Sequence, residues 1–357
     1  MQNRISLLPF LLVLTLAFSG CSSKPNSLTV NQPSAAGGQV VVGAGSTFVY
    51  PVMSRWIDDY QHNHPGVQIN YQSIGSGGGI QQLKQGVINF GASDLALDDN
   101  QLKDMPALVQ IPESAGPVCI TFNLPNLNQP LKLSGSTLSG IYLGTIKNWQ
   151  DPAIKKVNPG VNLPNQDIVV VHRSDGSGTS NIFTTYLAAV SPDWQKKVGK
   201  GLSVSWPTGI GGKGSEGVTG LVKQNPGAIG YVELTYAEEN KLPVAQVQNK
   251  AGEFVSPTAQ GTSAAIDAFA QQLSQDIRQP IVDPPASAAS AYPISGLTFL
   301  LVPKSQPDNK KASEVKEFVG YVISDGQGTA QQLHYAELPK SLQDIDKRLL
   351  DEVRAGG

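Results

Sequence analysis

The chain has 357 residues and a formal net charge of −2 at pH 7, and only 15% of its residues are charged. Charged residues usually make up about 25% of a soluble protein, and the lack of a basic excess argues against a nucleic-acid partner. With 40% hydrophobic residues, the chain is too apolar to be disordered. The length predicts about two domains, and the 37 glycines predict tight turns or backbone that approaches a ligand closely.

The N-terminus has the pattern of a bacterial secretory signal. Arg4 is followed by an uncharged apolar segment over residues 5–18, which is shorter than the roughly 20 residues of a membrane-spanning helix. Small residues then precede Cys21, and this arrangement resembles a lipobox, in which the cysteine is lipidated and becomes the mature N-terminus. We therefore predict a lipoprotein signal peptide over residues 1–20 and lipidation of Cys21. An ordinary secretory signal with a chance cysteine nearby is the alternative.

Residues 21–39 are rich in Ser, Pro, Asn and Gly and lack an apolar pattern, which predicts a flexible tether. A lipid, a tether and a globular body together describe a protein of the cell envelope or periplasm that is anchored to a bacterial membrane. The other cysteine, Cys119, lies in an apolar segment and is predicted to be a buried structural thiol. Because the globular part adds only four scattered histidines, the sequence predicts neither a metal site nor another cofactor.

From residue 40 onward, short β-rich segments alternate with helical ones. Strands are predicted over 40–42, 67–71, 88–92, 118–122, 168–172, 228–232 and 296–302. Helices are predicted over 51–63, 79–87, 179–190, 263–274, 312–324, 328–334 and 342–353. This alternation predicts an α/β architecture with a mainly parallel sheet in each domain. Ligands bind such sheets where strands end and helices begin, so these junctions are the candidate sites.

Three of these junctions are rich in Gly, Ser and Thr, and they cover residues 43–48, 75–79 and 173–180. The N-terminus of a helix has unpaired N–H groups and a partial positive charge, and it therefore binds anions. A helix cap would explain any one junction alone. Three of them, one of which carries Arg173, indicate an anion-binding site, and a fourth strand ends in small residues and Asp94.

Other glycine-rich sites do not fit these segments. Phe48 and Ile80 stand where the dinucleotide-binding motif GxGxxG requires its last glycine. The segment around Lys213 lacks both the first glycine and the hydroxyl residue of a P-loop. No serine has glycine both two residues before it and two residues after it, so the sequence lacks the nucleophile elbow of serine hydrolases.

The junctions belong to a longer series of motifs, which lie at 43–48, 75–78, 90–94, 138–144, 173–180, 209–214 and 226–233. This series closely resembles the phosphate-binding proteins of bacterial phosphate ABC importers, in the same order and over nearly all of residues 40–345. The resemblance implies a two-lobed class II periplasmic binding protein fold, α/β in class, with a hinge and a ligand cleft between the lobes. It places one lobe at 40–118 plus 290–357 and the other at 119–289.

The resemblance also implies which residues bind the ligand. The first lobe would contribute Thr47, Phe48 through its backbone N–H, Ser76 and Asp94. The second lobe would contribute Arg173, Asp175, Ser177, Gly178 and Thr179. Gly77 stands where some members of the family have a second serine, so that hydroxyl is missing. No catalytic residue is implied, and we expect His172 to be a packed or surface side chain.

The family binds inorganic phosphate by hinge closure and delivers it to a membrane permease, so the resemblance implies a monomeric, high-affinity binding protein that is not an enzyme. Arg173 offers an oxyanion a planar fork of donors. Asp94 is predicted to accept the proton that phosphate keeps and sulfate lacks, and Asp175 to orient Arg173. The alternatives are a lipoprotein phosphate sensor or adhesin, a binder of sulfate or molybdate, and a phosphate-ester hydrolase that uses Ser177 or Asp175.

Overall fold

The computed structural model describes residues 40–127 and 129–356, within a unit that spans residues 38–357. The predicted signal peptide, the tether and the lipidation site at Cys21 lie outside the described residues. Cys119 is fully buried in a strand, as predicted for a structural thiol, and is a free cysteine among the described residues. In the part of the chain that the structure describes, no helix is both long and apolar enough to cross a membrane.

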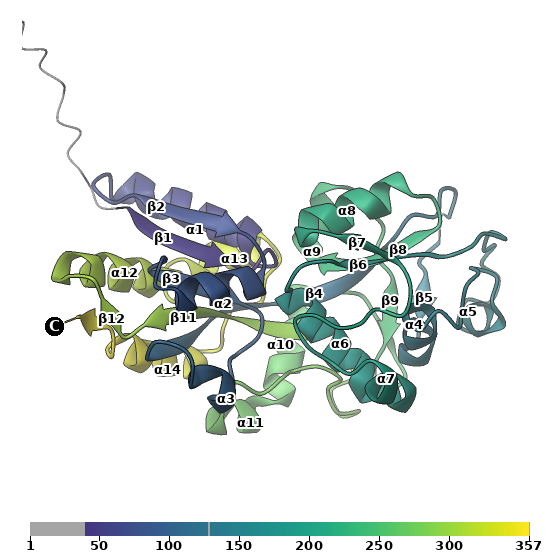
Figure 1. Ribbon diagram of the computed structural model, residues 1–357. Helices are drawn as coiled ribbons and strands as arrows, with labels where there is room; N and C mark the ends of the chain where they lie inside the picture. The colour runs from purple at the N-terminus through teal and green to yellow at the C-terminus, as the bar shows by residue number, and fades with distance from the viewer. Residues whose placement is uncertain (1–39, 128, 357) are drawn as a thin grey trace, which may run out of the picture. The chain divides into compact units, whose positions relative to one another are not determined.

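The main sheet contains eight strands in the order β2-β1-β3-β11-β4-β8-β6-β7 (Figure 1). Its strands are β1 (Val41–Gly45), β2 (Ile69–Ser73), β3 (Phe90–Ser93), β4 (Leu108–Phe122), β6 (Val169–Arg173), β7 (Ile210–Gly212), β8 (Ala228–Glu233) and β11 (Ser295–Pro303). β2, β1 and β3 pair in parallel at one end of the sheet, and β8, β6 and β7 pair in parallel at the other. The predicted α/β pattern is therefore present at both ends.

The two ends are joined by β4 and β11, which are antiparallel to each other. β11 is also antiparallel to β3, and β4 is antiparallel to β8. The prediction of a mainly parallel sheet in each domain is wrong for this central part, because the chain leaves the first group of strands along β4 and returns along β11. β4 pairs with β11 over Leu108–Pro117 and with β8 over Val118–Phe122. One strand thus passes from the first group of elements to the second (Figure 1).

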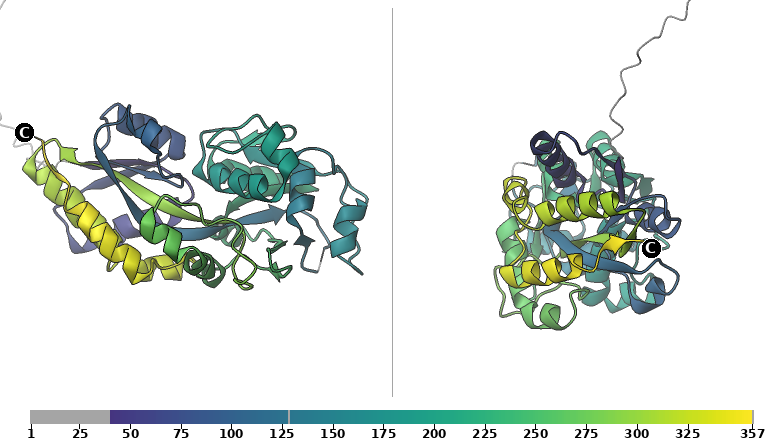
Figure 2. Two further views of the ribbon diagram at one scale, coloured as in Figure 1. Left: turned by 90° about the horizontal axis from the view of Figure 1, so that it is seen from below. Right: turned by 90° about the vertical axis from the view of Figure 1, so that its left-hand side faces the viewer.

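The first group of strands carries helices from both ends of the described chain. These are α1 (Tyr50–Asn63), α2 (Ser76–Lys84), α3 (Asp99–Leu102), α12 (Asn309–Val322), α13 (Gln327–Gln332) and α14 (Lys340–Leu350). On α1, the Trp56 indole donates a 2.7 Å hydrogen bond to the carbonyl of Gly326, and the Tyr60 ring contacts the ring of Phe318 at 5.4 Å between centroids. The C-terminal helices therefore complete the core that the N-terminal elements begin (Figure 2).

The second group contains α4 (Gly135–Tyr142), α5 (Pro152–Val157), α6 (Gly178–Val190), α7 (Pro192–Lys197), α8 (Gly214–Gln224) and α9 (Leu234–Glu239). A small sheet accompanies them, formed by β5 (Lys132–Leu133), β9 (Gln246–Gln248) and β10 (Phe254–Val255). On α6, the ring of Phe183 lies 4.7 Å from that of Tyr142 and 4.5 Å from that of Tyr231, and all three are fully buried. This aromatic packing fixes α6 against α4 and β8, and so positions the helix N-terminus at Gly178.

Two predicted helices differ from the structure. The helix predicted over 79–87 is α2, which begins at Ser76 and ends at Lys84, so Val87 lies beyond it and is 59% exposed. The helix predicted over 263–274 is two helices, α10 (Ala259–Ala268) and α11 (Ala270–Gln275), because Phe269 leaves the helical conformation at φ −110° and ψ 12°. Two short strands, β12 (Ser305–Gln306) and β13 (Arg354–Ala355), pair near the C-terminus.

Candidate anion-binding site

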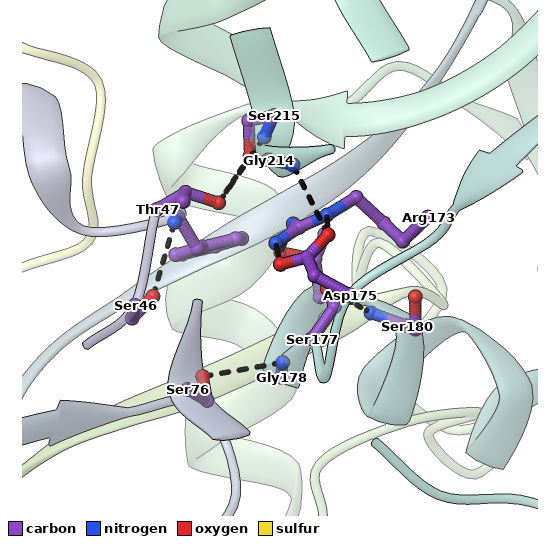
Figure 3. Close-up of polar contacts among 12 residues, drawn as sticks. Ser46, Thr47, Ser76, Arg173, Asp175, Ser177, Gly178, Ser180, Gly214 and Ser215 are labelled. Carbon is purple, nitrogen blue, oxygen red and sulfur yellow. Dashed lines mark hydrogen bonds and ion pairs between the residues drawn. The ribbon is translucent and has the colours of Figure 1, made fainter. Parts of the chain in front are cut away.

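The candidate site lies where the N-termini of α1, α2, α6 and α8 come together (Figure 3). The first turn of each helix leaves backbone N–H groups unpaired, so the site is rich in neutral donors. All nine residues predicted from the sequence lie in this region: Thr47, Phe48, Ser76, Asp94, Arg173, Asp175, Ser177, Gly178 and Thr179. Eight of them are buried and Asp175 is partly buried.

Arg173, at the end of β6, is held by Asp175 in a two-point contact. Its Nε donates to Asp175 Oδ1 at 2.8 Å, its Nη2 donates to Oδ2, and its Nη1 lies 3.5 Å from Thr179 Oγ1. Asp175 Oδ1 also accepts the N–H of Gly214 at 3.0 Å. Burial acts to raise the pKa of Asp175, but the hydrogen bonds and charge of Arg173 outweigh it and lower that pKa. Asp175 is therefore ionised at neutral pH, and it fixes the plane of the guanidinium.

Asp94 follows β3 and has one carboxylate oxygen without a partner. Its Oδ1 accepts the hydroxyl of Ser46, whereas Oδ2 is buried and has no hydrogen-bond partner among the described residues. Burial raises the pKa of Asp94 to about 6, although hydrogen bonds from Ser46 and the charge of Arg173 act to lower it. A buried acceptor without a donor is costly. Oδ2 is therefore suited to accept a proton from a bound group.

Residues of the two strand groups contact each other directly across the site. The hydroxyl of Thr47 lies 2.8 Å from that of Ser215 at the start of α8. Ser76 Oγ accepts the N–H of Gly178 at 3.2 Å, so the first turn of α2 touches the first turn of α6. The hydroxyl of Tyr236 on α9 donates to the carbonyl of Thr47 at 2.7 Å. The structure thus has both sides of the site closed together, as Figure 3 shows for the first two contacts.

Two glycines permit this close approach. A Cβ on Gly75 would lie 2.4 Å from Asp175 Oδ2, and the φ of +84° at this residue also disfavours other side chains. A Cβ on Gly178 would lie 2.5 Å from Ser76 Oγ and 2.6 Å from Asp94 Oδ2. All three distances are well inside van der Waals contact. The glycines are therefore needed where the two sides of the site meet.

Two predicted contacts take a different form in the structure. The backbone N–H of Phe48 donates to Ser46 Oγ at 3.0 Å, and so it is engaged by a neighbouring side chain. The hydroxyl oxygen of Ser177 accepts the N–H of Ser180 at 3.0 Å, which makes it the N-cap of α6. A capping serine keeps its own proton for donation to another group. Direct contact of Phe48 and Ser177 with a ligand stays a prediction.

Four further residues of the site were not predicted from the sequence. Ser46, Ser215 and Tyr231 lie within or beside the motifs at 43–48, 209–214 and 226–233, which could have indicated them. The Tyr231 hydroxyl accepts the backbone N–H of Arg173 at 3.1 Å and lies 2.6 Å from Ser180 Oγ. Tyr236 lies outside every motif, and its contact with Thr47 spans 189 residues. Only the folded chain identifies it.

His172 is a packed side chain, as predicted. Its ring stacks on that of Trp206 with centroids 4.9 Å apart and an angle of 12° between planes, and burial lowers its pKa. Over residues 40–127 and 129–356, no group of three or more His, Cys, Asp or Glu side chains is arranged to hold a metal ion.

Two groups of parallel strands, joined by two antiparallel strands and meeting at a buried polar site, define a two-lobed periplasmic binding protein. A family model described as a PBP superfamily domain matches residues 30–326. The phosphate-binding protein PstS of Xylella fastidiosa is 42% identical over 325 residues, which cover 91% of this chain and 88% of the relative. That of Pasteurella multocida is 41% identical over 89% of this chain and 92% of the relative. The chain belongs to the PstS family of phosphate-binding proteins.

Solved structures give the same fold at lower identity. A putative phosphate ABC transporter substrate-binding protein from Clostridium perfringens, with bound phosphate, has a TM-score of 0.61 at 21% identity and covers 84% of this chain and 100% of that one. A phosphate-binding protein from Stenotrophomonas maltophilia has a TM-score of 0.65 at 19% identity, over 87% of this chain and 93% of that one. These structures confirm the predicted two-lobed fold.

Proposed function

We propose that this protein binds inorganic phosphate between its two lobes and delivers it to the permease of a phosphate ABC importer. One observation carries the choice of ligand: the buried Asp94 Oδ2, without a donor among the described residues, lies in a site that also contains Arg173. An anion that keeps a proton satisfies both groups at once. Family membership supports a binding protein and argues against the phosphate-ester hydrolase.

The chemistry of the site favours phosphate over sulfate. Asp175 neutralises Arg173, so the attraction for an anion comes from the guanidinium N–H groups, the hydroxyls and the helix N-termini. Asp94 donates nothing, and its Oδ2 is placed to accept one hydrogen bond from the ligand. Phosphate supplies the proton for that bond, whereas sulfate would place a charged oxygen against a buried carboxylate. The low net charge of −2 is compatible with this mode of anion binding.

Binding is coupled to hinge closure of the two lobes, 40–118 plus 290–357 and 119–289. The exchange of partners by β4 near residue 118 supports this division, because the strand pairs with β11 before that point and with β8 after it. Phosphate held by Asp94 from one lobe and by Arg173 from the other would stabilise the closed form relative to the open one.

The protein acts as a monomer in the cell envelope, facing the periplasmic side of a bacterial membrane. The predicted signal peptide over 1–20 and membership of a family of phosphate-binding proteins support this location. A lipid on Cys21 and the tether over 21–39 would keep the body close to the permease, which raises its effective concentration there.

Titration calorimetry of the protein with phosphate and with sulfate, at several pH values, tests the proposal. A site that requires a hydrogen bond from its ligand can discriminate by about 10⁴ to 10⁵, so we expect tight phosphate binding and little heat from sulfate near neutral pH. Equal binding of the two anions would exclude the phosphate assignment and favour a general oxyanion binder.

A Gly178→Ala variant should bind phosphate roughly 5- to 150-fold more weakly, since forcing a methyl group into a packed site costs about 1–3 kcal/mol. The added Cβ would meet Ser76 Oγ and Asp94 Oδ2, both from the opposite lobe, and would hold the lobes apart. Calorimetry measures the loss. Gly220→Ala on α8 is the matched control, because its Cβ meets nothing within 4 Å; an equal loss in both variants would contradict the steric argument.

A further inference from the structure

A second buried carboxyl group lies beside the ligand-binding Asp94. Asp94 follows β3, Thr298 is on β11 and Glu113 is on β4, and these three strands are neighbours in the sheet. Glu113 and Thr298 are both 0% exposed. Neither residue belongs to the motifs of the sequence, and the proposed function gives them no role.

A β-bulge determines where the Glu113 side chain points. Thr298 pairs with Ser114 and Phe299 pairs with Pro112, so Glu113 is the extra residue of β4 opposite β11. An extra residue of this kind turns its side chain out of the regular alternation, and bulges are frequent next to functional sites. Here the bulge directs a carboxyl group to the hydroxyl of Thr298, with 3.0 Å between Glu113 Oε1 and Thr298 Oγ1.

Thr298 connects the two acids. The register of β11 with β3, in which Phe299 pairs with Ser93, places Thr298 next to Asp94, and the Thr298 hydroxyl donates to Glu113 Oε1 at 3.0 Å. Hydrogen bonding from Thr298 also acts to lower the pKa of both acids. A hydroxyl has one proton to donate, and it can favour only one acid at a time. The second oxygens, Glu113 Oε2 and Asp94 Oδ2, have no hydrogen-bond partner within the described residues.

The surroundings of Glu113 oppose a negative charge. Burial and the nearby charge of Asp94 raise the pKa of Glu113 to about 8, against the hydrogen bond from Thr298. The charges of both acids act to raise the pKa of Tyr71 on β2, and the Gln327 side chain on α13 donates to the backbone carbonyl of Glu113 at 2.9 Å. The charge of Arg173 acts on Asp94 and lowers its pKa. Glu113 is therefore protonated at neutral pH.

We propose that Glu113 is a positioning residue that acts through Thr298 on Asp94, the acceptor for the proton of bound phosphate. As a neutral acid, Glu113 donates to Thr298 Oγ1, and the threonine hydroxyl is then free to donate to Asp94. When Glu113 loses its proton, Thr298 donates to Glu113, and a second buried negative charge faces the ligand. Phosphate binding weakens as a result. This role rests on the proposed function.

The sign of the pH effect follows from the direction of this coupling. Binding of an anion favours the protonated form of Glu113, so the contribution of Glu113 to affinity is present below a pH of about 8 and is lost as the pH rises through that value. The ionisation of phosphate itself changes over the same range. The effect of phosphate ionisation on the dissociation constant is identical for any two variants, so it cancels in the ratio of their dissociation constants.

The test compares Glu113→Gln with the wild-type protein by calorimetry with phosphate at about pH 6 and about pH 10, either side of the Glu113 pKa of about 8. Glutamine keeps the size and a donor for Thr298 but does not ionise. We expect similar affinities at the lower pH. At the higher pH the variant should bind about tenfold more tightly than wild type, equivalent to one pKa unit of coupling.

Glu233→Gln is the matched control. Glu233 is also 0% exposed and has its pKa raised to about 8 by burial, but its carboxylate accepts the N–H of Thr235. This variant should follow the pH profile of wild type. A tenfold gain in both variants at high pH would mean that any buried acid has this effect, and would overturn the specific role of Glu113.

A double-mutant cycle with Thr298 tests the connection between the two acids with a second set of variants. In a Thr298→Val background the connection is lost, so adding Glu113→Gln should change the pH profile by less than it does in wild type. Thr298→Ser keeps the hydroxyl and should keep the profile. If Glu113→Gln and wild type have the same pH profile of phosphate affinity, the role of Glu113 is overturned and the proposed function is not. If the wild-type protein binds no phosphate, the proposed function is overturned.

Discussion

An Arg173→Lys variant is expected to bind phosphate at least about a hundredfold more weakly than wild type. The guanidinium is almost fully buried and makes two parallel hydrogen bonds to Asp175, which leave its remaining edge directed toward Thr179. A lysine amine is a point charge without a fixed plane, and it cannot hold Asp175 and an oxyanion in the same geometry. Calorimetry with phosphate measures the loss.

Arg173→Met should abolish measurable binding. Asp175 would then be a largely buried carboxylate without its cation, and breaking a buried pair by removing one partner costs about 3–5 kcal/mol of folding stability. Circular dichroism would show whether the variant is folded. Because Arg173 is also the residue that directs N–H groups at the anion, the loss in affinity should exceed any loss in folding stability.

The chain contains a matched control for the Arg173→Lys substitution. Arg278 makes the same kind of two-point contact, from Nε and Nη2 to the two oxygens of Asp276, but its side chain is 31% exposed. Arg278→Lys should therefore leave phosphate affinity within about twofold of wild type, as expected for a partly exposed pair. A Lys variant of Arg173 with near-wild-type affinity would contradict the assigned role.

The sequence was most informative where structure depends on neighbouring residues. The junctions at 43–48 and 173–180 were predicted as strand-to-helix turns, because Gly, Ser and Thr are typical of helix starts, and the structure places both there. The segment at 75–79 was predicted as a strand-to-helix junction with the helix beginning at Gly79, and its glycines disfavour helix formation. It is instead the first turn of α2, where a Cβ on Gly79 would lie 2.6 Å from the carbonyl oxygen of Ala44. Close helix–strand packing overrides the local preference.

Long-range pairing explains what the sequence could not predict. Whether β4 and β11 are parallel or antiparallel depends on where the chain returns, about 180 residues later. The hydrophobic periodicity of a segment predicts a strand but not the direction in which the strand pairs. The same holds for Ser215, which reaches Thr47 across 168 residues. The bulge at Glu113 is also invisible in the sequence, because only the pairing with Thr298 and Phe299 shows that β4 has an extra residue.

Replacing Asp94 by asparagine should reduce the preference for phosphate over sulfate by about a hundredfold. The asparagine amide can donate a hydrogen bond where the carboxylate can only accept one. Phosphate would then lose the acceptor for its proton, and sulfate would no longer face a buried negative charge. Phosphate affinity falls and sulfate affinity rises, so both changes reduce the ratio that calorimetry measures.

The pH dependence of the wild-type protein provides an independent measure of the same group. Burial raises the pKa of Asp94 to about 6, so this carboxyl is ionised above that pH and protonated below it. A protonated Asp94 donates as asparagine does. Sulfate binding by wild type should therefore strengthen as the pH falls through about 6, whereas sulfate binding by Asp94→Asn should stay constant over that range.

Asp98→Asn controls for the general effect of removing an acid near the site. Asp98 is the exposed N-cap of α3, where it accepts two backbone N–H groups, and asparagine caps a helix about as well as aspartate does. This variant should keep both the phosphate preference and the pH response. If Asp94→Asn kept them too, the ligand's proton would have to be accepted elsewhere. The role of Thr298 and Glu113 would then be excluded along with that of Asp94, because both act only through its carboxylate.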